Sequence, residues 1–378
     1  MSSMIETSSR RAFLHSCVAA LATVRARSAR AGGTANWSRY DDIVVVDAQG
    51  SLLGRGVPLS RALEDAKASG VTAVNITLGT TEREGLFEKT MAGIGEWEAR
   101  LAAHQDRLLK IRSAKDIETA KASSRLGIIY GFQDPGVLEG KIDRLRLLDD
   151  LGVRVIQLTY NRRGELGDGC LEPKDRGLTP FGRTVVEHMN ELGLLVDLSH
   201  CGRRTTAEAI AASKKPVSIT HAGCAAVADT PRNKTDDVLR SLADRGGVVG
   251  IYFMPFLRTK GNATAGDVIQ HVEHALNVCG EDHVGIGTDG GLSPVELTAE
   301  YRQRIREEVM RRRALGVSAP GEEADDVIPL VAELNDARRL EKLAELLLAR
   351  RHSAARVEKI LGANFLRLMR DVWVPNQA

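Results

Sequence analysis

Short runs of apolar, mostly β-branched residues recur along the chain, and a segment of helical length follows most of them. The run Ile43-Val44-Val45-Val46 is apolar at every position, which is typical of strands buried on both faces of a parallel sheet. Eight runs of this kind occur. The predicted strands are Ile43–Val46, Thr72–Leu78, Leu126–Phe132, Val153–Tyr160, Leu194–Ser199, Pro216–Thr220, Val248–Phe253 and Val284–Thr288.

The segments between these runs carry the signals of helices. Several begin at Ser, Thr or Asp and end at a glycine, such as Gly70, Gly152 or Gly193. The predicted helices are Ser60–Ala68, Gly140–Leu151, Pro180–Leu192 and Thr205–Ala212. Eight strands alternating with helices predict an α/β fold, a (β/α)8 TIM barrel, whose functional residues lie at the carboxyl ends of the strands. An open doubly wound sheet is the rival fold, and the absence of G-x-G-x-x-G after an early strand disfavours it.

The first 31 residues have the layout of a twin-arginine export signal. Arg10-Arg11 precedes a short apolar run, and Ala29-Arg30-Ala31 has the form of a cleavage site. The sequence therefore predicts a periplasmic or otherwise exported protein whose mature part, residues 32–378, is a single barrel domain.

Two further segments follow the last predicted strand. Residues 292–335 are rich in charged and small residues and are predicted to be an insertion with a basic helix near Tyr301–Arg313. Such an insertion serves as a lid, an oligomer contact or a solvated surface loop. The chain is predicted to close with helices near Asp336–Arg351 and Ser353–Val372, whose leucines have packing periodicity.

Composition and charge exclude several classes of protein. The 378 residues are 43% hydrophobic and carry 52 basic against 50 acidic side chains, so nothing in the charge points to nucleic acid. No run of eighteen apolar residues is present to span a bilayer. Residues 1–31 carry five arginines against one glutamate, so the rest of the chain has a formal charge of about −2. The five cysteines are too scattered for a disulfide scaffold or a zinc knuckle.

Candidate chemistry lies where the predicted strands stop. His200 and His221 follow two successive strands, and Asp289 follows the last one. Neutral imidazoles bind Zn²⁺, and a carboxylate can accept a proton from zinc-bound water. The joint placement of these three residues predicts a metal site at the mouth of the barrel. Other polar residues expected at the same end are Asp47, Gln49, Ser51, Gln133, Asp134, Tyr160 and Asn161.

Residues 151–200 resemble the corresponding block of the membrane (renal) dipeptidase family, peptidase family M19. The similarity continues through Pro216–His221, Pro231-Arg232-Asn233, Asp282–Gly290 and Gly362–Phe365, and so covers essentially the mature chain. The resemblance implies an amidohydrolase-type barrel with a binuclear zinc centre. It also implies hydrolysis of dipeptides, including those with a D-residue at the C-terminal position, and often a homodimer.

Four residues match functional positions of that family. By this resemblance His200 and His221 hold the second zinc, Asp289 is the catalytic aspartate, and Arg232 pairs with the substrate carboxylate. Tyr160 and Asn161 are expected to join Arg232 in binding the substrate.

Other family positions carry different residue types here. The first-strand H-x-D pair falls on Gln49 and Ser51, the glutamate that bridges both metals falls on Gln133, and a substrate-binding histidine falls on Tyr160. Neutral amides and hydroxyls are weak ligands, so we expect the first metal position to be lost and the second to be weakened.

Three hypotheses follow. The leading one is an exported zinc-dependent hydrolase of dipeptides or related small amides, with one zinc on His200 and His221. A second is a centre rebuilt from other residues, and a third is a catalytically inactive homologue that binds a small carboxylate-bearing ligand. Weak additional ligands for the single zinc are Gln133, Asp134 and Asp289, and the candidates for a rebuilt centre are Asp168, Cys170, Glu172, Cys201 and Cys224.

Overall fold

The computed structural model describes residues 37–378 except 55, 80–84, 323–325 and 375–378. The predicted export signal at 1–31 lies outside the described residues, and so does Cys17. Residues 36–378 form one compact unit. In the described part of the chain, no helix is long and apolar enough to cross a membrane.

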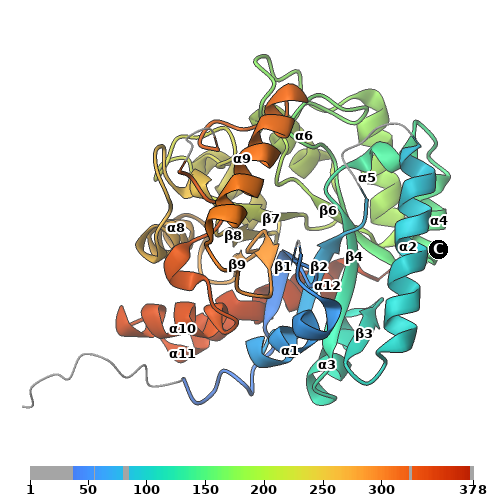
Figure 1. Cartoon of the computed structure of the whole chain (residues 1–378). Helices are drawn as coiled ribbons and strands as arrows, with labels where there is room; N and C mark the ends of the chain where they lie inside the picture. Colours follow the sequence, from blue (N-terminus) through green and yellow to red (C-terminus); the bar gives the residue numbers. More distant parts are fainter. Residues whose placement is uncertain (1–36, 55, 80–84, 323–325, 375–378) are drawn as a thin grey trace, which may run out of the picture. The chain divides into compact units, whose positions relative to one another are not determined.

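The strands form a single parallel sheet that curves into a barrel (Figure 1). Its order is β10-β1-β2-β4-β5-β6-β7-β8-β9, and β3 pairs with β4 beside this path. The strands are β1 (Val46–Ser51), β2 (Ala73–Thr77), β3 (Leu108–Ile111), β4 (Leu126–Phe132), β5 (Val153–Gln157), β6 (Leu195–Asp197), β7 (Ser218–Ala222), β8 (Val248–Ile251), β9 (Val284–Ile286) and β10 (Gly290–Gly291).

The two edges of the sheet meet through the short strand β10. It begins four residues after β9 ends, and it pairs in parallel with β1 through Gly50↔Gly290 and Ser51↔Gly291. The first and last of the predicted strands therefore lie side by side, and the prediction of a TIM-type α/β barrel is confirmed.

Helices surround this sheet (Figure 1). The four predicted between strands, and those predicted near 301–313, 336–351 and 353–372, are present close to their predicted bounds. In α5, for example, Thr179 Oγ1 accepts from the Gly182 amide, Pro180 is the first helical residue, and Gly193 ends the helix at φ 72°. The helices are α1 (Leu59–Ser69), α2 (Leu86–Ala103), α3 (Ala114–Ala122), α4 (Arg144–Asp150), α5 (Pro180–Leu192), α6 (Arg203–Ala212), α7 (Asp236–Asp244), α8 (Ala265–Cys279), α9 (Ala299–Ala314), α10 (Arg339–Ala349), α11 (Ala354–Glu358) and α12 (Asn364–Val372).

The first strand differs from its prediction. It begins at Val46 rather than Ile43, so Asp47, Gln49 and Ser51 lie within β1 and not after it. The apolar run ends at Val46, but the backbone pairing with β2 and β10 continues through the polar residues. Parallel pairing depends on the main chain and tolerates polar side chains at the end of a strand.

One end of the barrel is closed by α12. Apolar residues near the beginnings of the strands, including Val46, Val155 and Val248, form a buried cluster with Phe365 and Met369 of this helix. This plug covers the amino ends of the strands, and the carboxyl ends are left to form the functional face.

The interior of the barrel at β7, β8 and β9 has no room for a side chain at Gly250. A Cβ there would overlap the carbonyl oxygen of Thr220. We expect Gly250→Ala to lower the free energy of unfolding by about 1–3 kcal/mol, since overpacking forces the backbone to shift. Urea denaturation measures this change.

Gly95→Ala is the matched control, because Gly95 is exposed in α2 and its added methyl would meet nothing within 4 Å. It should leave stability unchanged or raise it by up to about 1 kcal/mol. Equal stability of Gly250→Ala and the unmodified protein would contradict this description of the interior.

Candidate active site

His200 and His221 meet at the carboxyl end of the barrel. His200 follows β6 and His221 lies in β7, and their Nε2 atoms are 2.9 Å apart. Both side chains are buried. The structure thus brings together the two histidines that the sequence singles out.

The hydrogen on His200 is fixed by Asn161. The Asn161 Nδ2 donates to the Val317 carbonyl at 2.7 Å, so its Oδ1 faces His200 Nδ1 at 2.6 Å and must accept. His200 therefore carries its hydrogen on Nδ1 and presents a lone pair at Nε2. The prediction that Asn161 binds substrate is not supported, because both ends of its buried amide are engaged and its contact orients His200.

His221 is fixed in the same way by Thr220. The Thr220 Oγ1 donates to Asp197 Oδ2 at 2.8 Å, so it accepts from His221 Nδ1, also at 2.8 Å. Burial, together with the Arg232 guanidinium, holds the pKa of both imidazoles well below the usual histidine value. Two neutral imidazoles therefore turn their unprotonated nitrogens toward each other, as histidines do when outer hydrogen bonds orient them for a metal ion.

Asp289 follows β9 and, like His200, lines a cavity at the carboxyl end of the barrel. Its φ is 57°, a left-handed conformation that is uncommon for residues other than glycine, and its amide donates to Gln49 O at 2.7 Å. Burial raises the pKa of the Asp289 carboxyl to about 6, and Arg232, Arg312 and a hydrogen bond with Gln133 limit the rise. Such a group can exchange a proton near neutral pH.

Two buried aspartates clamp the threonines that precede His221 and Asp289. Asp197 accepts from the amide and the hydroxyl of Thr220, both at 2.8 Å. Asp47 accepts from the amide of Thr288 at 2.8 Å and from its hydroxyl at 2.6 Å. Each clamp joins neighbouring strands and fixes the backbone one residue before a site residue. Sequence reasoning missed both clamps, although each threonine directly precedes a predicted site residue.

Arg232 and Tyr160 enclose His200 from other sides. The Arg232 side chain is 1% exposed, and it donates to Ser199 O at 2.6 Å and to His200 Nε2 at 3.1 Å. Tyr160 stacks on His200 with ring centroids 4.4 Å apart. The Tyr160 hydroxyl accepts from Arg312 Nη1 at 2.9 Å, and Arg312 belongs to α9 of the insertion. Sequence reasoning placed a basic helix here but did not assign Arg312 to the site.

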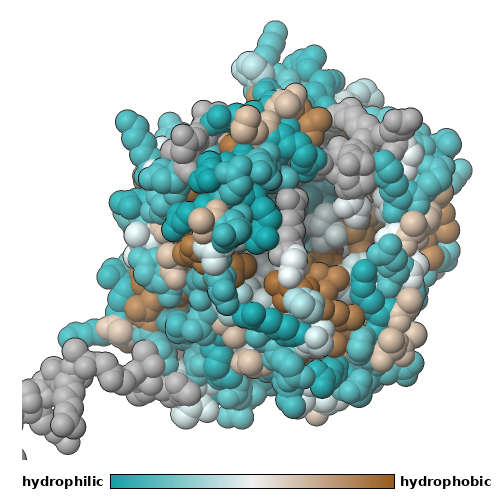
Figure 2. Space-filling view, in the orientation of Figure 1, coloured by the Kyte–Doolittle hydropathy of each residue, from teal (hydrophilic) through white to brown (hydrophobic). Residues whose placement is uncertain are grey.

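These groups line a cavity of about 240 Å³. The face of the molecule that carries α9 is largely hydrophilic and is hollowed near its centre (Figure 2). The strand ends supply Gln133, Tyr160, His200, Arg232 and Asp289 to the cavity.

The two positions where family ligands are expected to be lost, Gln49 and Ser51, and the weak ligand Asp134 are engaged with their neighbours. Gln49 Nε2 donates to Thr77 Oγ1 at 3.0 Å, and the Ser51 hydroxyl donates to Leu53 O at 2.9 Å. Asp134 Oδ1 accepts from the Gly136 amide at 2.8 Å at the start of a 3-10 turn, Pro135–Leu138, and lines neighbouring cavities. The expectation that Asp134 serves as a weak metal ligand is not supported, because its carboxylate caps this turn. Of the weak ligands, Gln133 and Asp289 line the same cavity as His200.

A rebuilt metal centre is not supported either. Asp168 forms ion pairs with Arg163 and Arg176. Throughout the described ranges, no group of three or more His, Cys, Asp or Glu side chains could hold a metal ion, and His200, His221 and Asp289 do not form such a group either. The described cysteines, Cys170, Cys201, Cys224 and Cys279, are free thiols.

The sequence profile of the membrane dipeptidase family, peptidase family M19, matches residues 55–313. The chain belongs to this family. It is 34% identical over 212 residues to the dipeptidase verJ of Clonostachys rogersoniana, covering 56% of this chain and 54% of that one. It is 28% identical over 273 residues to the dipeptidase tcpJ of Claviceps purpurea, covering 71% and 56%. The chain thus spans little more than half the length of these curated relatives.

Solved structures agree with the family assignment. An amidohydrolase from Pseudomonas aeruginosa has a TM-score of 0.76 and 32% identity, covering 88% of this chain and 98% of that one. A metallopeptidase from Rhodobacter sphaeroides, liganded with a phosphinate mimic of the dipeptide L-Ala-D-Ala, has a TM-score of 0.70 and 20% identity over 88% and 99%. The second likeness shows the shared fold.

The clamp on Thr220 leads to a stability prediction. Thr220→Val keeps the shape of the side chain but removes the hydroxyl that serves Asp197 Oδ2 and His221 Nδ1. We expect the free energy of unfolding to fall by about 1–3 kcal/mol, the cost of an unsatisfied buried polar group. Urea denaturation measures this free energy. The control is Thr184→Val, at an exposed position of α5, and its free energy of unfolding should lie within about 0.5 kcal/mol of that of the unmodified protein. Equal stability of the two variants would contradict the clamp.

Proposed function

We propose that this member of the family is a hydrolase of dipeptides or related small amides that uses one zinc ion held by His200 and His221. The observation that carries the proposal is the pair of Nε2 atoms 2.9 Å apart, each with its lone pair directed at the other. Two facing lone pairs repel unless a donor or a cation satisfies them; Arg232 Nη2 serves His200 Nε2 in this way, and a zinc ion would serve both nitrogens. By the resemblance, the other carboxylate and imidazole ligands of a binuclear centre correspond to the neutral Gln49, Ser51 and Gln133, so the proposal is limited to a single ion on the two histidines.

A zinc ion bound there would polarise an amide carbonyl and lower the pKa of a bound water. Asp289 would accept the proton of the attacking water and pass it to the departing amine. With a pKa of about 6, the Asp289 carboxyl is ionised at neutral pH and can still be protonated during the reaction. Arg232, buried beside His200, would pair with the substrate carboxylate through its planar guanidinium.

Family membership supports the dipeptide substrate, and the dipeptide-mimic ligand of the Rhodobacter sphaeroides metallopeptidase is consistent with it. A specific observation favours a second candidate function. The three neutral residues at family ligand positions, with Arg232 donating directly to His200 Nε2, suit a protein that binds a small carboxylate-bearing ligand and has lost turnover.

Zinc content and turnover distinguish the zinc-dependent hydrolase from the inactive binding protein. Protein purified with zinc present should contain about one zinc per chain by elemental analysis and should hydrolyse members of a dipeptide panel that includes D-configured second residues. His200→Ala with His221→Ala should lose both properties and remain folded. His188→Ala, on the outer side of α5, is the matched control and should keep both. Absence of both zinc and turnover, with carboxylate binding retained, would establish the binding protein.

The acidic limb of the pH profile tests the role of Asp289. The carboxylate must be ionised to accept a proton, so kcat/KM should rise with pH and level off above an apparent pKa near 6. Asp289→Asn should lower kcat/KM by about 100-fold or more and remove this limb. An unchanged limb in the variant would assign it to another group.

We also propose export by the twin-arginine route and assembly as a homodimer. Replacing Arg10-Arg11 by two lysines should leave the protein in the cytoplasm, as cell fractionation would show. Light scattering on the purified protein should give twice the mass of one chain. A monomer would contradict the dimer, and an unchanged periplasmic fraction of the lysine variant would contradict the route.

A further inference from the structure

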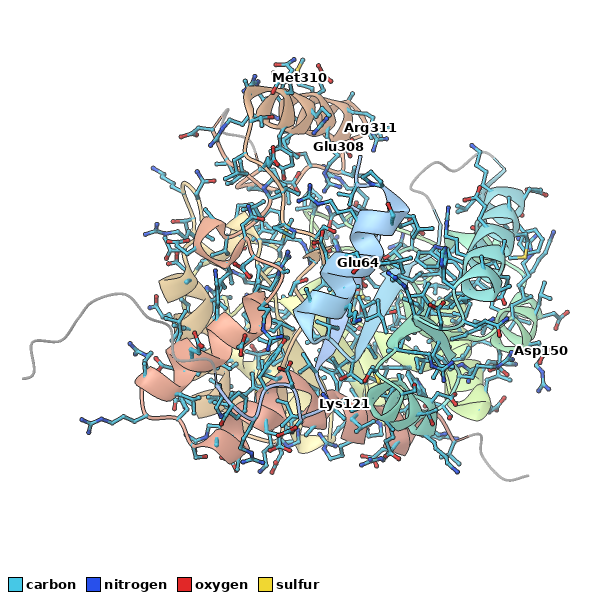
Figure 3. All side chains as sticks on the ribbon, turned by 60° about the horizontal axis from the view of Figure 1, so that its bottom comes forward. Glu64, Lys121, Asp150, Glu308, Met310 and Arg311 are labelled. Atoms are coloured by element: carbon cyan, nitrogen blue, oxygen red, sulfur yellow. The ribbon has the colours of Figure 1, made fainter. Side chains whose placement is uncertain are left out.

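The insertion that carries α9 forms one wall of the cavity. Ile305, Glu308, Val309 and Arg312 all line it. They are spaced at i, i+3, i+4 and i+7, so they share one face of the helix. Met310, on the opposite side, is 67% exposed and points away from the barrel (Figure 3). The helix therefore directs one face at the site and the other at solvent.

The insertion is held in place by the three residues that follow the β5 region. Tyr160 accepts from Arg312, Asn161 donates to Val317 O at 2.7 Å, and Arg162 Nε donates to Gly316 O at 2.6 Å. Two of these three residues also contact His200, one by stacking and one by a hydrogen bond. The position of α9 is thus tied to the histidine itself.

The charged groups on this wall are paired among themselves. Glu322 receives two hydrogen bonds from Arg312, Nε to Oε2 at 3.0 Å and Nη2 to Oε1 at 2.9 Å. Glu308 Oε1 accepts from Arg311 Nη2 at 2.8 Å. Because these charged groups pair with one another, the surface of the wall that a ligand would contact is mainly apolar. It comes from Ile305, Val309, Val327 and Pro329 of the insertion and from Met254 and Phe256 after β8.

The cavity is therefore two-sided, with the polar groups at the strand ends and apolar side chains across from them. We propose that α9, together with Val327 and Pro329, forms a subsite for a bulky apolar side chain, so that the ligand is a small amide with a free carboxylate and an aliphatic or aromatic substituent. This proposal rests on the proposed function, because Arg232, His200 and Asp289 define the polar end.

Selectivity follows from the burial of the substituent. A short side chain on the ligand would leave the apolar wall uncovered. A charged side chain would lose its hydrating water against the wall, which costs free energy. One methylene in an apolar pocket changes discrimination by about tenfold or more. We expect dipeptides that contain leucine or phenylalanine to bind more tightly than their glycine, aspartate and lysine counterparts by at least that factor.

The test uses two series of dipeptides, X-D-Ala and Ala-D-X, in which X is Leu, Phe, Gly, Asp or Lys. Calorimetry gives Kd and a ninhydrin-based assay gives kcat/KM for the full chain purified with zinc. In one of the two series the apolar members should bind at least about tenfold more tightly. Val309→Ser should reduce this preference about tenfold, and the neighbouring Met310→Ser, on the outer side of α9, should leave it unchanged.

The outcomes separate the two proposals. Apolar preference in Kd without hydrolysis would support the subsite and contradict the hydrolase. Hydrolysis with no preference in either series, or with equal effects of Val309→Ser and Met310→Ser, would overturn the subsite and leave the hydrolase intact. A preference for aspartate or lysine would also overturn it.

Discussion

The short contact between His200 and His221 sets the requirements for the rest of the site. Two neutral imidazoles 2.9 Å apart are stable only if their tautomers are fixed and a cation or a donor satisfies the facing nitrogens. Asn161 fixes one ring and Thr220 fixes the other. Arg232 supplies a donor to His200, and the two histidines would hold the proposed zinc. Asp197 of β6 holds Thr220 of β7, so the orientation of His221 depends on the pairing of these two strands.

The same device recurs at Asp289. Asp47 holds Thr288 by its amide and hydroxyl, and the next residue adopts a left-handed conformation. Strain of this kind costs of order 1–3 kcal/mol and persists only where the surroundings determine it. Because β9 is adjacent to β1 only through the closure of the barrel, the geometry of Asp289 depends on that closure. Fold and site are therefore coupled through two buried carboxylates, Asp47 and Asp197.

Much of the fold could be predicted from apolar runs, because parallel strands buried on both faces are apolar at nearly every position. The predictions missed β3, in which Lys110 interrupts the apolar residues, and four helices, α2, α3, α7 and α8. Two of those helices begin with capping boxes, Ser113 with Asp116 and Thr264 with Asp267, and this signal was readable. At the site, His200, His221, Asp289, Arg232 and Tyr160 come together as predicted. The roles of Asp134 and Asn161 stay predictions. In the fold, Asp134 caps a 3-10 turn, and Asn161 contacts His200 and Val317, which are distant from it in the sequence.

The central claim is that one metal ion lies between His200 and His221 while the position next to Gln49 and Ser51 holds none. Anomalous diffraction at the zinc edge, from crystals grown with zinc present, tests it most directly. The account predicts a single peak within bonding distance of both Nε2 atoms. Two peaks, or a peak that lies away from either histidine, would contradict it, and so would the absence of any peak at the site.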